Sequence, residues 1–178
     1  MSLKKTFISL TLVLFSLISL NAQENFVRTD SISSFINFSI NALDIHGTIA
    51  GIDTNILLDK ENLEASNINI SATVRTINTG NLVRDKKVIS KKNLNEKEYP
   101  LITFESTKIT EMEPNVYMVA GDLTIRDITD QIFIEMYFEL DRVLGVSYFN
   151  TNDFDFSIKG KENNKIDFFL ELFHPGAE

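Results

Sequence analysis

The sequence has 178 residues, enough for one domain with a substantial hydrophobic core. It contains no cysteine, which excludes disulfides and a cysteine-linked lipid anchor. The formal net charge of −8 argues against nucleic acid as a partner and against electrostatic docking on anionic lipid, because an acidic surface is repelled by both.

The first 22 residues have the pattern of a secretory signal peptide. Lys4 and Lys5 form a basic start, and residues 7–20 are an apolar run too short for a comfortable membrane span. Ala22 is the small residue that a signal peptidase needs, so we predict cleavage between Ala22 and Gln23. The product would be a periplasmic or secreted protein with no stable membrane anchor after cleavage. Losing the two leader lysines would change the net charge from −8 to −10.

Alternating apolar and polar residues follow a short lead-in at 23–29, which we expect to be flexible. This alternation is typical of half-buried strands and is clearest at 68–76. Gly47 and Gly51 suggest bends within the second strand. The eight predicted strands run over 34–41, 45–58, 68–76, from 102 onward, 117–125, 132–140, 153–158 and 166–172.

The alternation stops between the third and fourth predicted strands. Asn78 or Thr79 is expected to cap a short helix there, with Leu82 and Val83 near its start. Pro100 limits where the next strand can begin. We expect this helix to plug or cover one end of the sheet, with Arg84 and Asp85 each bonded to flanking strands.

Eight strands joined as hairpins predict an all-β fold: an eight-stranded antiparallel barrel over 23–178, with one helical insertion. One face of nearly every strand is apolar, so the interior is predicted to be apolar too. Such a barrel either fills itself with side chains or encloses one small ligand, and the pattern leaves both open. The residues predicted to line a pore are Phe38, Ile40, Phe104, Leu123, Ile125, Phe138, Phe154 and Phe156.

No pair of nucleophile and base stands out in the sequence, and we predict neither a catalytic site nor a metal site. His46 lies in a glycine-flanked turn and His174 near the end of the sequence, so both are interpreted as surface histidines. Asp153 and Asp155 fall on a strand face that is predicted to be outward and solvated. A basic cluster is interpreted as a solvated helix face; it comprises Lys86, Lys87, Lys91, Lys92 and Lys97.

Three motifs in order resemble the YceI-like family. The first is Thr76-Ile77-Asn78-Thr79 followed by Arg84-Asp85, the second covers 99–106 (YPLITFES), and the third covers 121–129 (GDLTIRDIT). The resemblance implies a secreted, lipocalin-like antiparallel barrel. Members of that family bind long polyisoprenoid chains, including isoprenoid quinones, in an elongated apolar pore.

The sequence departs from the family pattern at three places. Asp127 stands where the third motif usually has glycine, and residues 30–34 lack the histidine of the family's opening Asp-x-x-His-Ser. Thr151 replaces the arginine of an Asn-Arg-x-x-Phe element. The lost His and Arg are residues that could contact a ligand head group.

Two classes of function follow, with a third left open. The first is a binding or carrier protein for an isoprenoid or similar apolar lipid, without cofactor or nucleic acid. The second is a small barrel enzyme acting on a hydrophobic substrate, and the third is a filled structural barrel. A homodimer is also left open.

Overall fold

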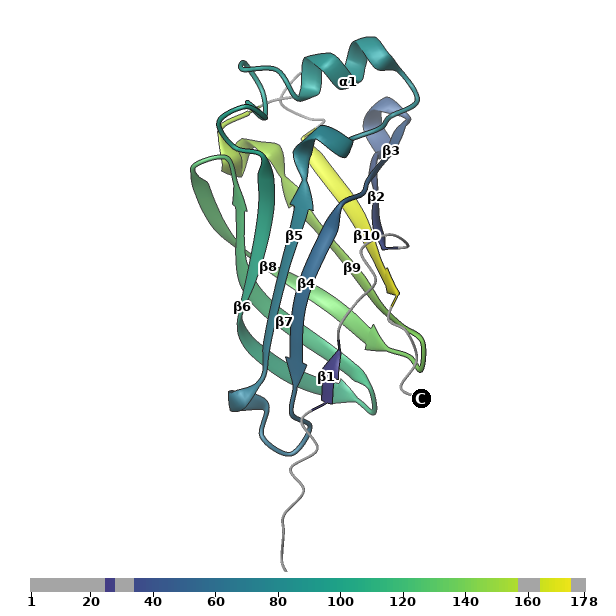
Figure 1. Ribbon diagram of the computed structural model, residues 1–178, viewed down its shortest axis with the longest axis vertical. Helices are drawn as coiled ribbons and strands as arrows, with labels where there is room; N and C mark the ends of the chain where they lie inside the picture. Colours follow the sequence, from purple (N-terminus) through teal and green to yellow (C-terminus); the bar gives the residue numbers. More distant parts are fainter. Residues whose placement is uncertain (1–24, 28–33, 157–163, 174–178) are drawn as a thin grey trace, which may run out of the picture.

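Figure 1 shows the computed structural model, an antiparallel sheet curled around its own axis with one α-helix across one end. The structure describes residues 25–27, 34–156 and 164–173. Within them the strands are β1 Asn25–Val27, β2 Phe35–Ile40, β3 Ile45–Ile49, β4 Ile52–Leu58, β5 Asn67–Thr73, β6 Leu101–Glu113, β7 Val116–Ile125, β8 Ile128–Phe138, β9 Arg142–Asn150 and β10 Lys165–Phe173. The helix is α1 Leu82–Val88, and four 3-10 turns are η1 Asn41–Leu43, η2 Leu63–Ala65, η3 Val74–Thr76 and η4 Thr151–Phe154.

The strands form one sheet in the order β1-β4-β5-β6-β7-β8-β9-β10-β2-β3, and every neighbouring pair is antiparallel. The all-β antiparallel fold with a helical insertion is therefore confirmed, with ten strands in the described residues instead of eight. The two outer strands are β3 and β1. Near one end of the curled sheet, β3 is joined to the loop before α1 by an antiparallel bridge between Thr48 and Asn78. The backbone N–H group of each residue donates to the carbonyl of the other at 2.9 Å.

The β7–β8 hairpin shows why the alternation predicted the fold so well. Tyr117, Val119 and Leu123 of β7 are buried on one face, and the pairing continues without interruption from Val116 to the turn after Ile125. Apolar residues at every second position all reach the interior because side chains alternate across a strand. This register fixes which side chains face the space inside the curl.

The second predicted strand, 45–58, is two strands. The extended conformation is interrupted at Ala50 and Gly51, where Gly51 adopts a φ of 62°, a left-handed conformation that glycine tolerates. As a result β3 pairs with β2, whereas β4 pairs with β5 and β1. Part of the lead-in that we expected to be flexible also forms a strand, β1.

The strand predicted at 153–158 is wrong, and a strand that the alternation did not predict, β9, lies just before it. Residues 151–154 form the 3-10 turn η4, and Asp155 follows with a φ of 53°. The interior face of β9 carries Val143, Gly145, Ser147 and Phe149, while the outer face carries Leu144, Val146 and Tyr148. Apolar residues therefore occur on both faces of β9, and Gly145 and Ser147 interrupt the inner one, so the alternation did not signal a strand.

The N-terminal cap of α1 is Asn81, not Asn78 or Thr79. The Asn81 side chain accepts hydrogen bonds from the backbone N–H groups of Val83 and Arg84, both at 3.1 Å. Asn78 instead accepts from the N–H of Gly80 at 2.9 Å. The third strand also ends earlier than predicted, because 74–76 turn into η3.

Several predictions concern residues outside the described ranges: the signal peptide and its cleavage site, residues 30–33, Ile158 and His174. In the part of the chain that the structure describes, no helix has the length and apolar character needed to cross a bilayer.

Candidate ligand cavity

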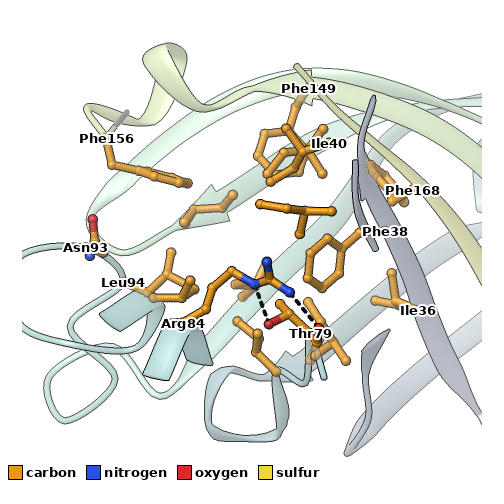
Figure 2. A pocket seen from close by; sticks show the side chains of 18 of the residues that line it. Ile36, Phe38, Ile40, Thr79, Arg84, Asn93, Leu94, Phe149, Phe156 and Phe168 are labelled. Atoms are coloured by element: carbon orange, nitrogen blue, oxygen red, sulfur yellow. Dashed lines mark hydrogen bonds between the residues drawn. The ribbon is translucent and has the colours of Figure 1, made fainter. Parts of the chain in front are cut away.

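A cavity of about 320 Å³ lies inside the curled sheet, next to α1. Figure 2 shows its walls, which are aliphatic and aromatic side chains from both ends of the sequence. The lining residues are Ile36, Phe38, Ile40, Leu43, Ile45, Ile49, Ala72, Ile77, Thr79, Arg84, Lys87, Val88, Asn93, Leu94, Ile102, Leu123, Ile125, Phe149, Phe156, Ile166 and Phe168.

Five of the eight predicted pore residues lie on this wall. They are Phe38, Ile40, Leu123, Ile125 and Phe156. Four of them come from β2 and β7, where alternation predicted the interior face correctly. Their role in binding a ligand stays a prediction.

The Phe38 ring is placed by a glycine on the neighbouring strand. Phe38 and Gly47 are paired across β2 and β3. A Cβ atom at Gly47 would lie 2.3 Å from Cζ of Phe38, so only glycine leaves room for the ring in this position. In Figure 2 the Phe38 ring lies beside the Arg84 side chain at the edge of the cavity.

The other three predicted pore residues lie away from the cavity, in filled parts of the core. Phe104 is buried against Gly121, and Phe138 packs edge-to-face on the fully buried Tyr117, with ring centroids 5.4 Å apart. Phe154 is fully buried behind the cavity wall, with its ring edge-to-face on Phe149 at 5.4 Å. The interior is therefore hollow near α1 and filled around these three rings.

Several lining residues were not among those predicted. Phe149 falls in β9, which has apolar residues on both faces and was not predicted as a strand, while Phe168 lies in β10 on the face that alternation places inside. Ile77, Val88 and Leu94 come from α1 and its flanking loops. No strand alternation extends into these loops, so only the folded chain shows that they close the cavity.

The polar part of the wall centres on Thr79. Arg84 donates from Nε to Oγ1 of Thr79 and from Nη2 to its backbone carbonyl, both at 2.7 Å. Asp85 accepts from the Thr79 hydroxyl and, at 2.9 Å, from its backbone N–H. The expectation that Arg84 and Asp85 bond flanking strands is therefore wrong, since both bind the loop that precedes α1. Figure 2 shows the Arg84 guanidinium directed toward the cavity, with its two bonds to Thr79 dashed.

Two further polar residues, Lys87 and Asn93, complete the wall on the α1 side. Asn93 donates to the Lys87 carbonyl at 2.6 Å, which fixes the turn after the helix. Lys87 is exposed as well as lining the cavity, so the cavity meets solvent beside α1. Among the described residues, the four polar side chains on the wall can all donate hydrogen bonds, and none of them is acidic.

The other polar candidates lie elsewhere. His46 is exposed, 3.5 Å from Asp44, and Asp153 and Asp155 are exposed in and after η4, not on a strand face. Among the described residues, no group of three or more His, Cys, Asp or Glu side chains is placed to hold a metal ion.

The positions that depart from the family pattern have local structural roles. Thr151 is fully buried and donates to Oδ1 of Asn164 at 3.2 Å, and it does not line the cavity. Asp127 lies in the β7–β8 turn, where the residue with a left-handed φ, 61°, is Arg126. Ser34, the last residue of the opening motif, is buried and accepts from the N–H of Phe173 at 3.1 Å.

Comparisons with known proteins match most of the chain. A family model described as a YceI-like domain matches residues 28–172. Protein YceI of Escherichia coli O157:H7 is 28% identical over 138 residues, which are 75% of this chain and 72% of the relative. A UPF0312 protein of Pseudomonas savastanoi pv. phaseolicola is 29% identical over 158 residues, 82% of this chain and 81% of the relative.

Solved structures share the fold. Burkholderia cenocepacia BcnA superposes with a TM-score of 0.70 at 15% identity, over 83% of this chain and 99% of that one. A polyisoprenoid binding domain from Saccharophagus degradans, implicated in plant cell wall breakdown, gives a TM-score of 0.56 at 11% identity, over 84% and 98% of the two chains.

Proposed function

The chain belongs to the YceI-like domain family, and from its cavity we propose that it is a binding or carrier protein for one apolar lipid of isoprenoid type. The observation that carries this proposal is the apolar cavity of about 320 Å³ beside α1. Its volume lies within the range of ligand sites, about 300–1,000 Å³, and its few polar groups gather on one side, as in such sites. The polyisoprenoid binding domain with the same fold supports the choice of ligand class.

An apolar chain would bind here without strong polar anchors. A cavity of this volume has room for roughly ten water-sized groups, since a water occupies about 30 Å³ of liquid. Ten methylene-sized groups leaving water contribute roughly 8 kcal/mol before the ligand's loss of freedom is subtracted. A lipid much longer than this must displace α1 or project past it.

The head group of the lipid is proposed to lie on the α1 side. Lys87 and Asn93 present donors there, whereas Arg84 and Thr79 are already bonded to each other and Asp85 holds Thr79 as well. A carbonyl, hydroxyl or phosphate oxygen fits such a wall, because it accepts hydrogen bonds.

We favour binding over catalysis because the cavity wall offers no free hydroxyl among the described residues. The one hydroxyl on the cavity wall, that of Thr79, is held between Arg84 and Asp85 and fixes the start of α1. A filled structural barrel, the remaining alternative, does not account for the hollow beside α1.

Export is part of the proposal and is supported by Lys4, Lys5 and the apolar run at 7–20. N-terminal sequencing of the protein from its native host should begin at Gln23. A chain in the membrane fraction that still begins at Met1 would contradict export.

The binding proposal is tested by mass spectrometry of an organic extract of the purified protein. We expect one class of lipid with a prenyl-type chain, near one molecule per chain, and much less from a variant in which Ala72, on the cavity wall, is replaced by Phe. A lipid-free extract from protein expressed in its native host, or equal recovery from the Ala72→Phe variant, would contradict it.

A further inference from the structure

The outer side of α1 combines exposed aliphatic side chains with unpaired cations. Leu82 and Val83 are 78% and 80% exposed, and Lys86 follows at helical spacing on the same side of the helix. Lys91 and Lys92 are exposed in the turn after α1. We call these five residues the lid surface. Figure 1 shows α1 at the extremity of the molecule, so its outer side faces away from the sheet.

The charge of this segment is opposite to that of the rest of the chain. Residues 82–97 contain six of the 17 Lys and Arg residues but only two of the 25 Asp and Glu residues. Both acids already have partners: Asp85 accepts from Thr79, and Glu96 pairs with Arg75 at 2.8 Å. Within the described ranges, none of the lysines of the lid surface forms an ion pair. The lid surface is therefore positive on an acidic protein.

We propose that the lid surface docks on an anionic lipid bilayer, with Leu82 and Val83 entering the interface and the lysines contacting lipid phosphates. Exposed aliphatics beside lysines are the composition of segments that lie in membrane interfaces. Each lysine close to an anionic leaflet favours binding by about fivefold. Because the cavity reaches solvent beside Lys87, docking in this orientation places its opening at the membrane.

The net charge of the whole chain argues against membrane docking, but the acidic residues at the opposite end of the sheet lie too far from the lid surface to repel a membrane bound there. Three turns at the opposite end of the sheet, together with the end of β6, carry seven acids: Asp59, Glu61, Glu64, Glu111, Glu113, Glu139 and Asp141. The ten residues of β7 separate the ends by about 30 Å, several times the Debye length of about 8 Å at physiological salt. Near α1 the turns carry five acids, which confine contact to the lid surface: Asp44, Glu98, Asp127, Asp153 and Asp155.

Sedimentation with vesicles tests this proposal. The protein purified from its native host, where the leader is predicted to be removed, should bind vesicles of phosphatidylcholine with phosphatidylglycerol, and bind pure phosphatidylcholine at least tenfold more weakly. Binding should fall as salt rises from about 0.1 M to about 1 M, where the Debye length shrinks from about 10 Å to about 3 Å.

Matched variants separate the lid surface from the rest of the molecule. Leu82→Ser with Val83→Ser, and separately Lys86→Glu with Lys91→Glu, should each weaken binding at least tenfold while leaving the melting temperature within a few degrees. Leu140→Ser is the control, because Leu140 is 90% exposed between Glu139 and Asp141 at the opposite end of the sheet. It should bind like the wild type.

Three results would overturn the proposal. They are absence of binding to the anionic vesicles, equal loss of binding in the Leu140→Ser control, and a wild-type dimer in solution that the Leu82→Ser, Val83→Ser variant dissociates, since the lid surface would then contact a second copy. Docking does not depend on the identity of the carried lipid: extraction can fail while vesicle binding holds, and the reverse.

Discussion

Two phenylalanines, each packed over a glycine, give opposite predictions because one lies in filled core and the other at the cavity. Phe104 is 4% exposed and lies over Gly121, whereas Phe38 lies over Gly47 with the cavity on its other side. Replacing Phe104 with Ala should lower the free energy of unfolding by about 3–5 kcal/mol. At about 2–4 °C per kcal/mol for a chain of this size, the melting temperature should fall by roughly 10 °C.

Phe38→Ala should cost less, about 1–3 kcal/mol, because the ring faces a void on one side and loses fewer contacts. The two variants should also differ in their response to lipid. A ligand that binds only the folded state stabilises it by mass action, so Phe104→Ala should keep the full increment on loading. Phe38→Ala removes part of the cavity wall and should lose much of that increment.

Urea denaturation of delipidated and loaded protein measures both effects, with Phe133→Ala as the control. Phe133 is 58% exposed on the outer face of β8. Its replacement should change neither the free energy of unfolding nor the increase on lipid loading by more than about 0.5 kcal/mol. Equal losses for Phe104→Ala and Phe38→Ala, with equal lipid increments, would refute the assignment of the cavity to the α1 end.

Three further variants test single side chains, and a fourth, Lys87→Ala, is the control for one of them. Tyr117→Phe should raise the free energy of unfolding by about 1 kcal/mol, because the buried hydroxyl has no hydrogen-bond partner among the described residues. Burial, and to a lesser extent Glu111, raise the pKa of Tyr117 above its usual 10.0, so the native state favours the neutral phenol. Wild-type stability should therefore fall above about pH 10, and less in Tyr117→Phe, as urea titrations at several pH values would show. Arg84→Ala should lower the melting temperature more than it weakens lipid binding, because two hydrogen bonds to Thr79 are lost. Lys87→Ala should leave the melting temperature unchanged. If Arg84→Ala instead weakens lipid binding more than it lowers the melting temperature, Arg84 contacts the head group. Gly47→Ala should cost about 1–3 kcal/mol by overpacking and reduce lipid content in extracts, and unchanged stability would contradict the close approach of Phe38.

The sequence predicted the sheet best where one face is uniformly apolar. In β7 the alternation from Tyr117 to Ile125 corresponds to the observed burial, and in β2 it placed Phe38 and Ile40 correctly inside. It failed at β9, where Gly145 faces the core and Val146 faces solvent, because close packing inside required a small residue. Alternation can be read only where one face of a strand is apolar and the other polar, and β9 has apolar residues on both faces.

The site was less predictable than the sheet. The position of the cavity depends on how far side chains such as Phe104 and Phe138 fill the interior. That is set by packing and side-chain volume, which the alternation pattern does not contain. The network at Thr79 could not be predicted either. Asn78 and Thr79 were the expected caps of α1, but Asn81 takes that role while Thr79 binds Arg84 and Asp85. Pattern alone cannot rank such local alternatives.

The most direct test of the carrier function is the melting temperature of the protein as purified, after delipidation, and after addition of a long prenyl quinone. We predict that delipidation lowers it and that the quinone restores it, because the ligand binds only the folded state. Ala72→Phe, which fills the cavity from β5, should melt at one temperature in all three conditions. If the three wild-type samples melt together, the cavity holds no lipid and the carrier function is contradicted.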